Sequence, residues 1–505
     1  MSEPRTPAAP LTTTTTTTAS PLRSLFFPLL ALVAALCTAV GVGGERGVVA
    51  GLFVAAAILW VSEAIHPAAT ALVVIAAAPL VGACTVKEAF AALGNPILFL
   101  FVGSFMIAEA MRIHGLGERL AAALTRRANT RLSALVVTSS TAFLLSMWIS
   151  NSAATAVVLP IALALAKSDA RFRSAQVLGV AWAASMGGLC TPVGTPPNLI
   201  GMRALEAQGT PVTFGGWMAI GLPIALVMLV AMVVLLAWRF GLRPGQRLTT
   251  DKSETTTSTS AVLGGPRGAG ATADVDKIRT TTKPWARGEI AAMSAFLLAV
   301  VLWIVPGVLE LFEVAWVKPL KARLSEEVVA VVAALLLFVW PIHRRGETPR
   351  RALSWDEAKH IDWGTVILFG GGILLGDLAN KSGLAKVWGT ALLDASGAHA
   401  TWAVVALVTI VALVLSELAS NTASATLVIP LAIGLAQAAG VDPRVAVMGA
   451  TLGASFGFMM PISTAPNAMA YATGAVTVRQ MASTGIVFDV VGYLIVVVGV
   501  LLLVS

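Results

Sequence analysis

Two short polar segments interrupt apolar runs of this sequence, and their side chains could bind ions. Residues 150–152 read SNS, and residues 420–422, which follow 270 positions later, read SNT. A polar core of this kind is costly in lipid unless a partner satisfies it. Hydroxyl and amide oxygens suit a small hard cation, whereas the Asn and Thr donors and free backbone N–H groups suit an anionic oxygen. The segments therefore predict sites for a cation, an anion or both.

Both segments lie inside a longer internal repeat. Without a gap, residues 146–166 and 416–436 are identical at nine of 21 positions. A second match has the same spacing of 270 residues: PISTAPN (residues 461–467) resembles TPVGTPPN (residues 191–198) and is one residue shorter. Chance similarity between apolar segments is the alternative interpretation. The matches concentrate on Ser, Asn, Pro and Gly, which favours a true repeat.

The composition indicates a polytopic helical membrane protein. Of the 505 residues, 57% are hydrophobic and 12% are charged, against about 25% charged in soluble proteins. Apolar runs of about 20 residues recur along the chain, each long enough to cross a bilayer as a helix. The net charge of +8 comes from basic residues in the predicted loops, so membrane topology explains it better than a nucleic-acid partner does.

The chain divides into two membrane halves joined by a linker. We expect a disordered tail at 1–21, a first half at 22–242, a flexible cytoplasmic linker at 243–288 and a second half at 289–505. In each half, a segment of apolar, polar and again apolar residues fits a re-entrant hairpin with the polar residues at its tip, at 132–166 and at 400–437. Each half also contains a helix broken by Pro and Gly, at 174–207 and at 444–475.

The basic residues predict the orientation. Lys and Arg crowd four segments, 112–131, 167–173, 239–287 and 344–359. If all four are cytoplasmic, the chain has a cytoplasmic N-terminus, eleven transmembrane helices and a C-terminus outside. The two hairpins then enter from opposite sides. The predicted fold class is an all-α polytopic membrane protein with two re-entrant hairpins in an inverted repeat, an arrangement common in secondary transporters.

The two hairpin tips and the two helix breaks then converge near the middle of the membrane, and none of their motifs contains Lys, Arg or His. One helix N-terminus stabilises an anion by about 0.3–2 kcal/mol, whereas burying a carboxylate costs several kcal/mol. We therefore expect bound cations to supply the missing positive charge. For either tip alone, a kinked helix that satisfies its own polar groups is the alternative. Two inverted copies favour the functional interpretation.

At these residues the sequence resembles the divalent anion/sodium symporter family, the solute carrier 13-type transporters of dicarboxylates, citrate and sulfate. The resemblance is carried by NPILFLFVGSFMIAEAMRIHGL (residues 95–116), MWISNSAATAVVLP (147–160), TPVGTPPN (191–198) and ASFGFMMPISTAPNAM (454–469). It implies a homodimer in the cytoplasmic (plasma) membrane, in which a transport domain moves against a scaffold by an elevator motion.

The resemblance also implies the ligands. One sodium ion would be bound by Ser146, Ser150, Asn151 and Gly194, and a second by Ser416, Ala419, Asn421 and Ser463. The anion would contact Asn151, Ser152, Thr195, Pro196, Asn421, Thr422, Thr464 and Ala465. Ser152 stands where dicarboxylate members usually have Thr, and Ala465 replaces the first proline of a TPP-like turn. Both departures lie beside the predicted anion.

Other polar residues of the apolar runs are given structural roles. We interpret Glu63, Glu109, Asp377 and Glu417 as paired or helix-end groups rather than proton carriers. Glu417 is the exception among these residues, because it lies four residues before Asn421. The histidines His66 and His114 and the three cysteines show no metal-binding spacing, and no cofactor other than sodium is predicted.

Taken together, these observations predict a sodium-coupled importer of small divalent anions, such as the C4-dicarboxylates succinate, malate or fumarate. A symporter for sulfate or another divalent anion and a sodium-independent dicarboxylate exchanger are the alternatives. The chain is not expected to be an enzyme: an intramembrane hydrolase needs a nucleophile with a His or Lys base, or an Asp pair on adjacent spans, and the sequence shows neither. A channel is disfavoured because inverted broken hairpins suit alternating access.

Overall fold

The computed structural model describes residues 21–125, 128–166, 169–248, 284–310, 319, 323–343 and 348–504. In these ranges all regular secondary structure is helical, and only two isolated bridges occur, Thr130 with Arg247 and Pro341 with Arg351. The predicted all-α class is therefore confirmed. The predicted tail, apart from Pro21, and most of the predicted linker lie outside the described residues.

The helices follow the apolar runs of the sequence. The first half contains α1 (Pro21–Val42), α2 (Gly44–Ser62), α3 (Pro67–Leu80), α4 (Val86–Ala91), α5 (Pro96–Ile113), α6 (Leu116–Thr125), α7 (Arg131–Ser146), α8 (Asn151–Leu165), α9 (Ala170–Gly187), α10 (Pro196–Ala207) and α11 (Phe214–Phe240). The second half contains α13 (Arg287–Glu310), α15 (Glu326–Val339), α16 (Trp355–Ala358), α17 (Trp363–Lys381), α18 (Leu384–Ser396), α19 (Thr401–Leu418), α20 (Asn421–Ala439), α21 (Pro443–Gly453), α22 (Ala465–Ala472) and α23 (Val478–Leu503). Two short 3₁₀ turns, η1 (Ala92–Gly94) and η2 (Gly188–Cys190), extend α4 and α9.

Several of these helices suit a bilayer. Within the described ranges, nine helical segments are long and apolar enough to cross a membrane. Large aliphatic side chains lie exposed along α1, α11 and α23, among them Leu29, Val230 and Val498. Exposed apolar surface of this extent is expected where lipid rather than water surrounds the helix.

One group of helices packs around α5 and α17. It comprises α1, α2, α3, α5, α13, α15 and α17, in which α1 packs on α2, α3 on α17 and α5 on α15. Small residues allow the closest of these crossings. A Cβ atom on Gly103 of α5 would lie 2.5 Å from the Ala330 carbonyl carbon of α15, so only glycine fits there.

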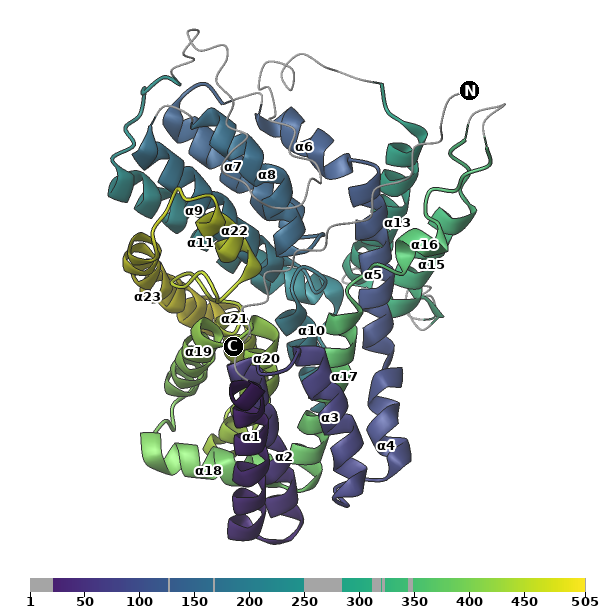
Figure 1. Cartoon of the computed structure of the whole chain (residues 1–505), viewed down its shortest axis with the longest axis vertical. Helices are drawn as coiled ribbons and strands as arrows, with labels where there is room; N and C mark the ends of the chain where they lie inside the picture. The colour runs from purple at the N-terminus through teal and green to yellow at the C-terminus, as the bar shows by residue number, and fades with distance from the viewer. Residues whose placement is uncertain are drawn as a thin grey trace, which may run out of the picture.

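A second group contains both helix–tip–helix segments and both broken helices. The segments α7–α11 and α19–α23 interleave: α10 of the first half packs on α20 and α21, and α22 of the second half packs on α8 and α9. Figure 1 shows α10 and α21 in the middle of the molecule, with the α7–α8 segment above and the α19–α20 segment below. The two breaks are thus enclosed by helices from both halves.

The helices α6 and α18 each connect the two groups. α6 lies between α5 and α7 in the chain and contacts both, and α18 follows α17 and packs along α20. The α18–α20 crossing brings two glycines together: a Cβ atom on Gly389 would lie 2.0 Å from the Gly434 carbonyl carbon. These two connectors attach the interleaved group to the first group.

Candidate functional site

The first tip joins α7 to α8 through residues 147–150. Ser150 caps α8 by accepting the Ala153 N–H at 3.3 Å, the usual role of a serine at that position. The Ser146 hydroxyl donates to Asn151 Oδ1 at 2.7 Å. Three of the four residues predicted to bind the first sodium ion therefore lie together around one turn of the chain.

The second tip has the same construction. Ser420 caps α20 by accepting the Ala423 N–H at 3.3 Å, and the Ser416 hydroxyl lies 2.9 Å from Asn421 Oδ1. Two backbone carbonyl oxygens, those of Ala454 and Phe456, also lie within hydrogen-bonding distance of the Ser416 hydroxyl. One hydroxyl proton cannot serve three acceptors at once, so lone pairs are left over in this oxygen cluster.

The first helix break is held by one buried side chain. Asn198 lies in the first turn of α10, and its amide nitrogen donates to Gly188 O at 2.8 Å and to Thr191 O at 2.7 Å. The Thr191 hydroxyl donates to the Met147 carbonyl oxygen, which belongs to the first tip. The break and the tip are therefore fixed to each other.

Close packing at Gly188 brings the remaining first-half residues to this tip. A Cβ atom on Gly188 would lie 2.7 Å from Asn151 Oδ1, 3.1 Å from the Thr195 Cβ and 3.2 Å from Gly194 O. The structure thus brings together the four predicted sodium ligands of the first half. Thr195, predicted to contact the anion, lies beside them.

The second break repeats this arrangement. Asn467 donates to Gly457 O at 2.6 Å and to Met460 O at 3.0 Å. The Ser463 hydroxyl lies 3.0 Å from Glu417 O, which places the break against the second tip. A Cβ atom on Gly457 would lie 2.9 Å from Thr464 Cγ2, 3.2 Å from Ser463 Cβ and 3.6 Å from Asn421 Oδ1.

The predicted anion contacts sit at four helix N-termini, which favour negative charge. Asn151 and Asn421 begin α8 and α20, and Thr195 and Thr464 are the residues just before α10 and α22. Pro196 is the first residue of α10, whereas Ala465 is the first residue of α22 and therefore offers a backbone N–H that Pro196 lacks. Ser152 and Thr422 follow the two asparagines, with Ser152 partly exposed and Thr422 at 9% exposure.

The residues that sequence analysis treated as structural have mostly local partners. The Glu109 carboxylate binds Arg112 through two hydrogen bonds, and His66 Nδ1 accepts the Ala68 N–H at the start of α3. His114 Nε2 lies 2.7 Å from Ala352 O. These groups lie away from both tips in the chain and have no arrangement that points to chemistry.

Glu417 differs from these groups, because it is buried beside the second tip. One of its carboxylate oxygens accepts the Phe458 and Met459 N–H groups at 2.6 and 3.0 Å, and the other accepts the Ser463 hydroxyl at 2.8 Å. A second buried carboxyl, Asp489 of α23, interacts with Glu417. The sequence analysis did not single out Asp489.

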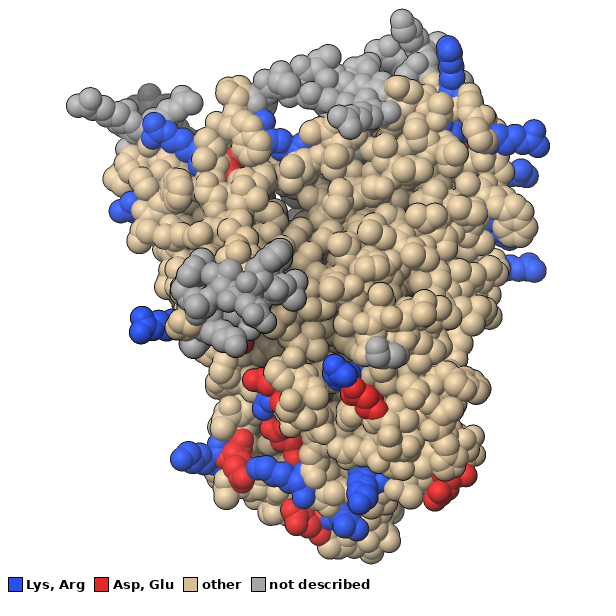
Figure 2. Space-filling view, turned by 180° about the vertical axis from the view of Figure 1, so that it is seen from behind, with Lys and Arg blue, Asp and Glu red and all other residues tan. Residues whose placement is uncertain are grey.

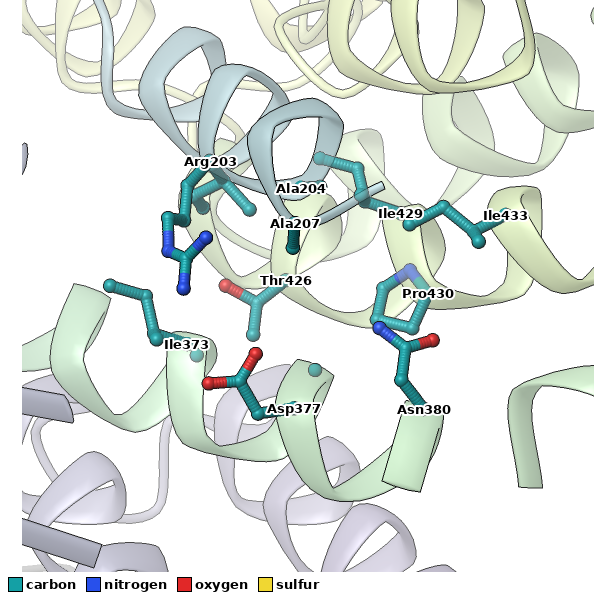
Figure 3. Close-up of a pocket in the computed structure, with 13 residues that line it drawn as sticks. Arg203, Ala204, Ala207, Ile373, Asp377, Asn380, Thr426, Ile429, Pro430 and Ile433 are labelled. Atoms are coloured by element: carbon teal, nitrogen blue, oxygen red, sulfur yellow. The ribbon is translucent and has the colours of Figure 1, made fainter. Parts of the chain in front are cut away.

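A separate hollow lies between α10, α17 and α20. Figure 3 shows Arg203 of α10 above Asp377 of α17, with Asn380 and Thr426 beside them. None of the residues predicted to bind sodium or the anion lines this hollow. The residues that line the hollow on α10 and α20 lie at least one helical turn after the N-termini of these helices, where the predicted anion contacts are. We therefore treat the hollow as distinct from the candidate site.

Comparisons with known proteins agree with this architecture. Residues 21–503 match the family described as "Sodium:sulfate symporter transmembrane region". A protein of Staphylococcus saprophyticus named sodium-dependent dicarboxylate transporter SdcS is 31% identical over 471 residues, which cover 88% of this chain and 85% of the relative.

Two solved transporters share the fold at low sequence identity. The YdaH transporter of Alcanivorax borkumensis has a TM-score of 0.53 at 13% identity and covers 95% of this chain and 97% of its own. MtrF of Neisseria gonorrhoeae has a TM-score of 0.56 at 13% identity, with 95% and 94% covered. The family match over nearly the whole described chain and the 31% identical relative establish that the chain belongs to the sodium:sulfate symporter family, a family of membrane transporters rather than enzymes.

Proposed function

We propose that this chain is a sodium-coupled secondary transporter that imports small divalent anions, specifically C4-dicarboxylates such as succinate, malate and fumarate. The observation that carries the proposal is the matched pairing of each tip with its own break. In both halves an Asn Oδ1, a Ser hydroxyl and helix N-termini converge on one place. Uncharged oxygens suit a monovalent hard cation, and the N-termini suit carboxylate oxygens.

The sodium requirement follows from charge. The predicted contacts include no Lys, Arg or His, and the second tip holds the buried Glu417 carboxyl as well. A dianion in this setting needs positive charge that the side chains do not supply. Sodium bound at Ser146, Ser150, Asn151 and Gly194, and at Ser416, Ala419, Asn421 and Ser463, would provide it. The name of the staphylococcal relative, a sodium-dependent dicarboxylate transporter, supports both ligands.

The proposed mechanism is elevator-type alternating access in a homodimer. The interleaved group that carries both tips (α7–α11 and α19–α23) would move as the transport domain against the α5–α17 group. The connectors α6 and α18 would transmit the motion between the two groups. We further propose that α7–α8 and α19–α20 are re-entrant hairpins from opposite sides, within a topology of eleven transmembrane helices.

The proposed location is the cytoplasmic membrane, with the N-terminus in the cytoplasm and the C-terminus outside. In Figure 2, Lys and Arg dominate the upper end of the face shown, whereas the lower end carries both signs of charge. Most of the surface between the two ends is uncharged. An excess of basic residues on the cytoplasmic side is the usual rule, so we assign the upper end to the cytoplasm.

A symporter for sulfate is the second candidate, because the family description names sulfate and because Ser152 and Ala465 change the surroundings of the anion. The test is uptake of radioactive succinate into proteoliposomes with an inward sodium gradient, in competition with malate, fumarate, citrate and sulfate. We expect the C4-dicarboxylates to compete and sulfate to fail. Strong inhibition by sulfate without inhibition by malate would make the sulfate symporter the better candidate.

A further inference from the structure

Two carboxyl groups are buried against each other beside the second tip. Glu417, near the end of α19, is 7% exposed, and Asp489, in the middle of α23, is 3% exposed. Asp489 interacts directly with the Glu417 side chain. In the part of the chain that the structure describes, no hydrogen-bond donor reaches either Asp489 oxygen. A buried polar group without a partner is rare and calls for an explanation.

The Glu417 carboxyl accepts hydrogen bonds from three groups. These are the Phe458 and Met459 N–H groups and the Ser463 hydroxyl. Asp489 therefore faces a side chain that acts as an acceptor in each of these contacts, so a positive charge is needed between the two carboxyls.

The repeat does not require a carboxyl at this place. The position equivalent to Glu417, 270 residues earlier, is Met147. Both backbone carbonyls lie against a hydroxyl of the neighbouring break, because the Thr191 hydroxyl donates to Met147 O and the Ser463 hydroxyl lies 3.0 Å from Glu417 O. The first tip therefore keeps its geometry with an apolar side chain. The carboxyl at the second tip is an addition to the shared architecture.

The surroundings make two negative charges costly. Phe458 packs on Phe488 with 4.8 Å between ring centroids, and Trp182 stacks on Phe488 at 5.4 Å. A Cβ atom on Gly485 would lie 2.4 Å from Phe458 O, so α23 rests directly on the segment that binds Glu417. Among the described residues, no Lys, Arg or His forms an ion pair with either carboxyl (compare the ion pairs of Glu109 and Glu289). A buried carboxylate pair needs positive charge between its members.

We propose that Glu417 and Asp489 bind a monovalent cation between their carboxylates, in addition to the two sodium ions predicted at the tips. The inference rests on the proposed function in one respect, which is that sodium is the ion used. Magnesium demands near-octahedral coordination and keeps several waters, and calcium takes six to eight oxygens. Two carboxylates alone do not provide either coordination, so we assign the ion as sodium, the coupling ion of the proposed function. This third ion would link α23 to the second tip.

The test counts sodium ions bound by the purified full-length protein in detergent, without substrate, from binding of radioactive sodium at saturation. The variants are Asp489→Asn and Glu417→Gln, which keep the shape of each side chain and remove one charge. Asp377→Asn is the matched control, because it removes a partly buried charge from α17 in the hollow of Figure 3. Thermal unfolding in parallel identifies folded protein, and Glu417→Gln decides the question if Asp489→Asn does not fold.

We expect both site variants to bind one sodium ion fewer than the wild type, and Asp377→Asn to bind the same number. The apparent sodium affinity of uptake should fall by about tenfold or more, since even groups that only orient a metal ligand contribute that much. Wild-type sodium counts in both site variants would overturn the proposal. An unchanged count with an altered pH dependence of uptake would identify a shared proton instead, and would overturn it as well. Failure of the proposed function would be seen separately, as an absence of sodium-driven dicarboxylate uptake by the wild type.

Discussion

Asn198 and Asn467 hold the two broken helices in the same way. Each side-chain amide donates to the carbonyl oxygens ten and seven residues before it, those of Gly188 and Thr191 in the first half and those of Gly457 and Met460 in the second. Both asparagines are 0% exposed. A helix break leaves carbonyls without helical partners, and in the membrane no water is available to satisfy them. The two side chains therefore make the breaks possible.

Asn198→Ala and Asn467→Ala should each destabilise the protein. Each substitution removes the side-chain donor from two buried carbonyls, of which Thr191 O and Met460 O also accept the backbone N–H of Gly194 and Ser463. The expected loss is about 1–3 kcal/mol, the cost of leaving a buried polar group unsatisfied. Thermal unfolding in detergent measures the loss. Gln437→Ala is the control, since its amide donates to Gln208 near the surface. Equal stability of Asn198→Ala and Gln437→Ala would show that the asparagine does not hold the break.

Asn151→Ala and Asn421→Ala should abolish uptake while the protein stays folded. The Oδ1 atom of each residue accepts a hydrogen bond from the Ser hydroxyl of its own tip, so the folded structure should survive its loss. We propose that the same amide serves both sodium and the anion, so its loss removes both interactions. Asn380→Ala, which truncates an amide in the separate hollow of Figure 3, should keep wild-type uptake. Substantial uptake by either tip variant would remove that tip from the site.

Ser152→Thr should change selectivity more than maximal rate. The hydroxyl is retained and one methyl group is added, and a methyl group in a fitted pocket changes the binding free energy by roughly 1 kcal/mol. Competition curves for succinate and sulfate, recorded with the wild type and the variant, measure the effect. If the two pairs of curves coincide, Ser152 does not line the anion pocket.

Asp169 should make part of the stability sensitive to acid. The Phe172 N–H, first of all, and the Arg131 charge hold the pKa of this carboxyl below its ordinary value of 3.8. Because the pKa is lowered by folding, the stabilisation is present above pH 3.8 and is lost as the pH falls through the folded-state value. The difference in unfolding free energy between the wild type and Asp169→Asn should therefore be constant near neutral pH and shrink as the pH falls below 3.8. A difference that is independent of pH would contradict this account.

The internal repeat explains why so much of the candidate site could be predicted. Ser150, Asn151 and Pro160 recur with identical spacing in the second half, and polar residues inside apolar runs stand out. The structure then places Asn151 against Gly194 and Thr195 through Gly188, a contact that the resemblance implied and that spacing alone did not. The prediction of the ligands themselves remains to be tested by binding.

Other features escaped the sequence analysis for physical reasons. The connector α18 is 13 residues long and contains Lys386 and Asp394, so a search for apolar runs of about 20 residues passes over it. Its signal was present in Gly383 and Gly397, which flank it with φ of 71° and 65°. Asp489 pairs with Glu417 only through the packing of α23 on the second break. A lone Asp inside an apolar helix was the available clue.

The central claim is that sodium supplies the positive charge for the anion. The most direct measurement is succinate uptake into proteoliposomes at fixed pH, with sodium replaced isosmotically by potassium or choline. We predict that uptake disappears without sodium, and that sodium and succinate each raise the affinity of the other by the same factor. Full uptake in potassium or choline would contradict the symport mechanism and leave sodium-independent exchange as the better account.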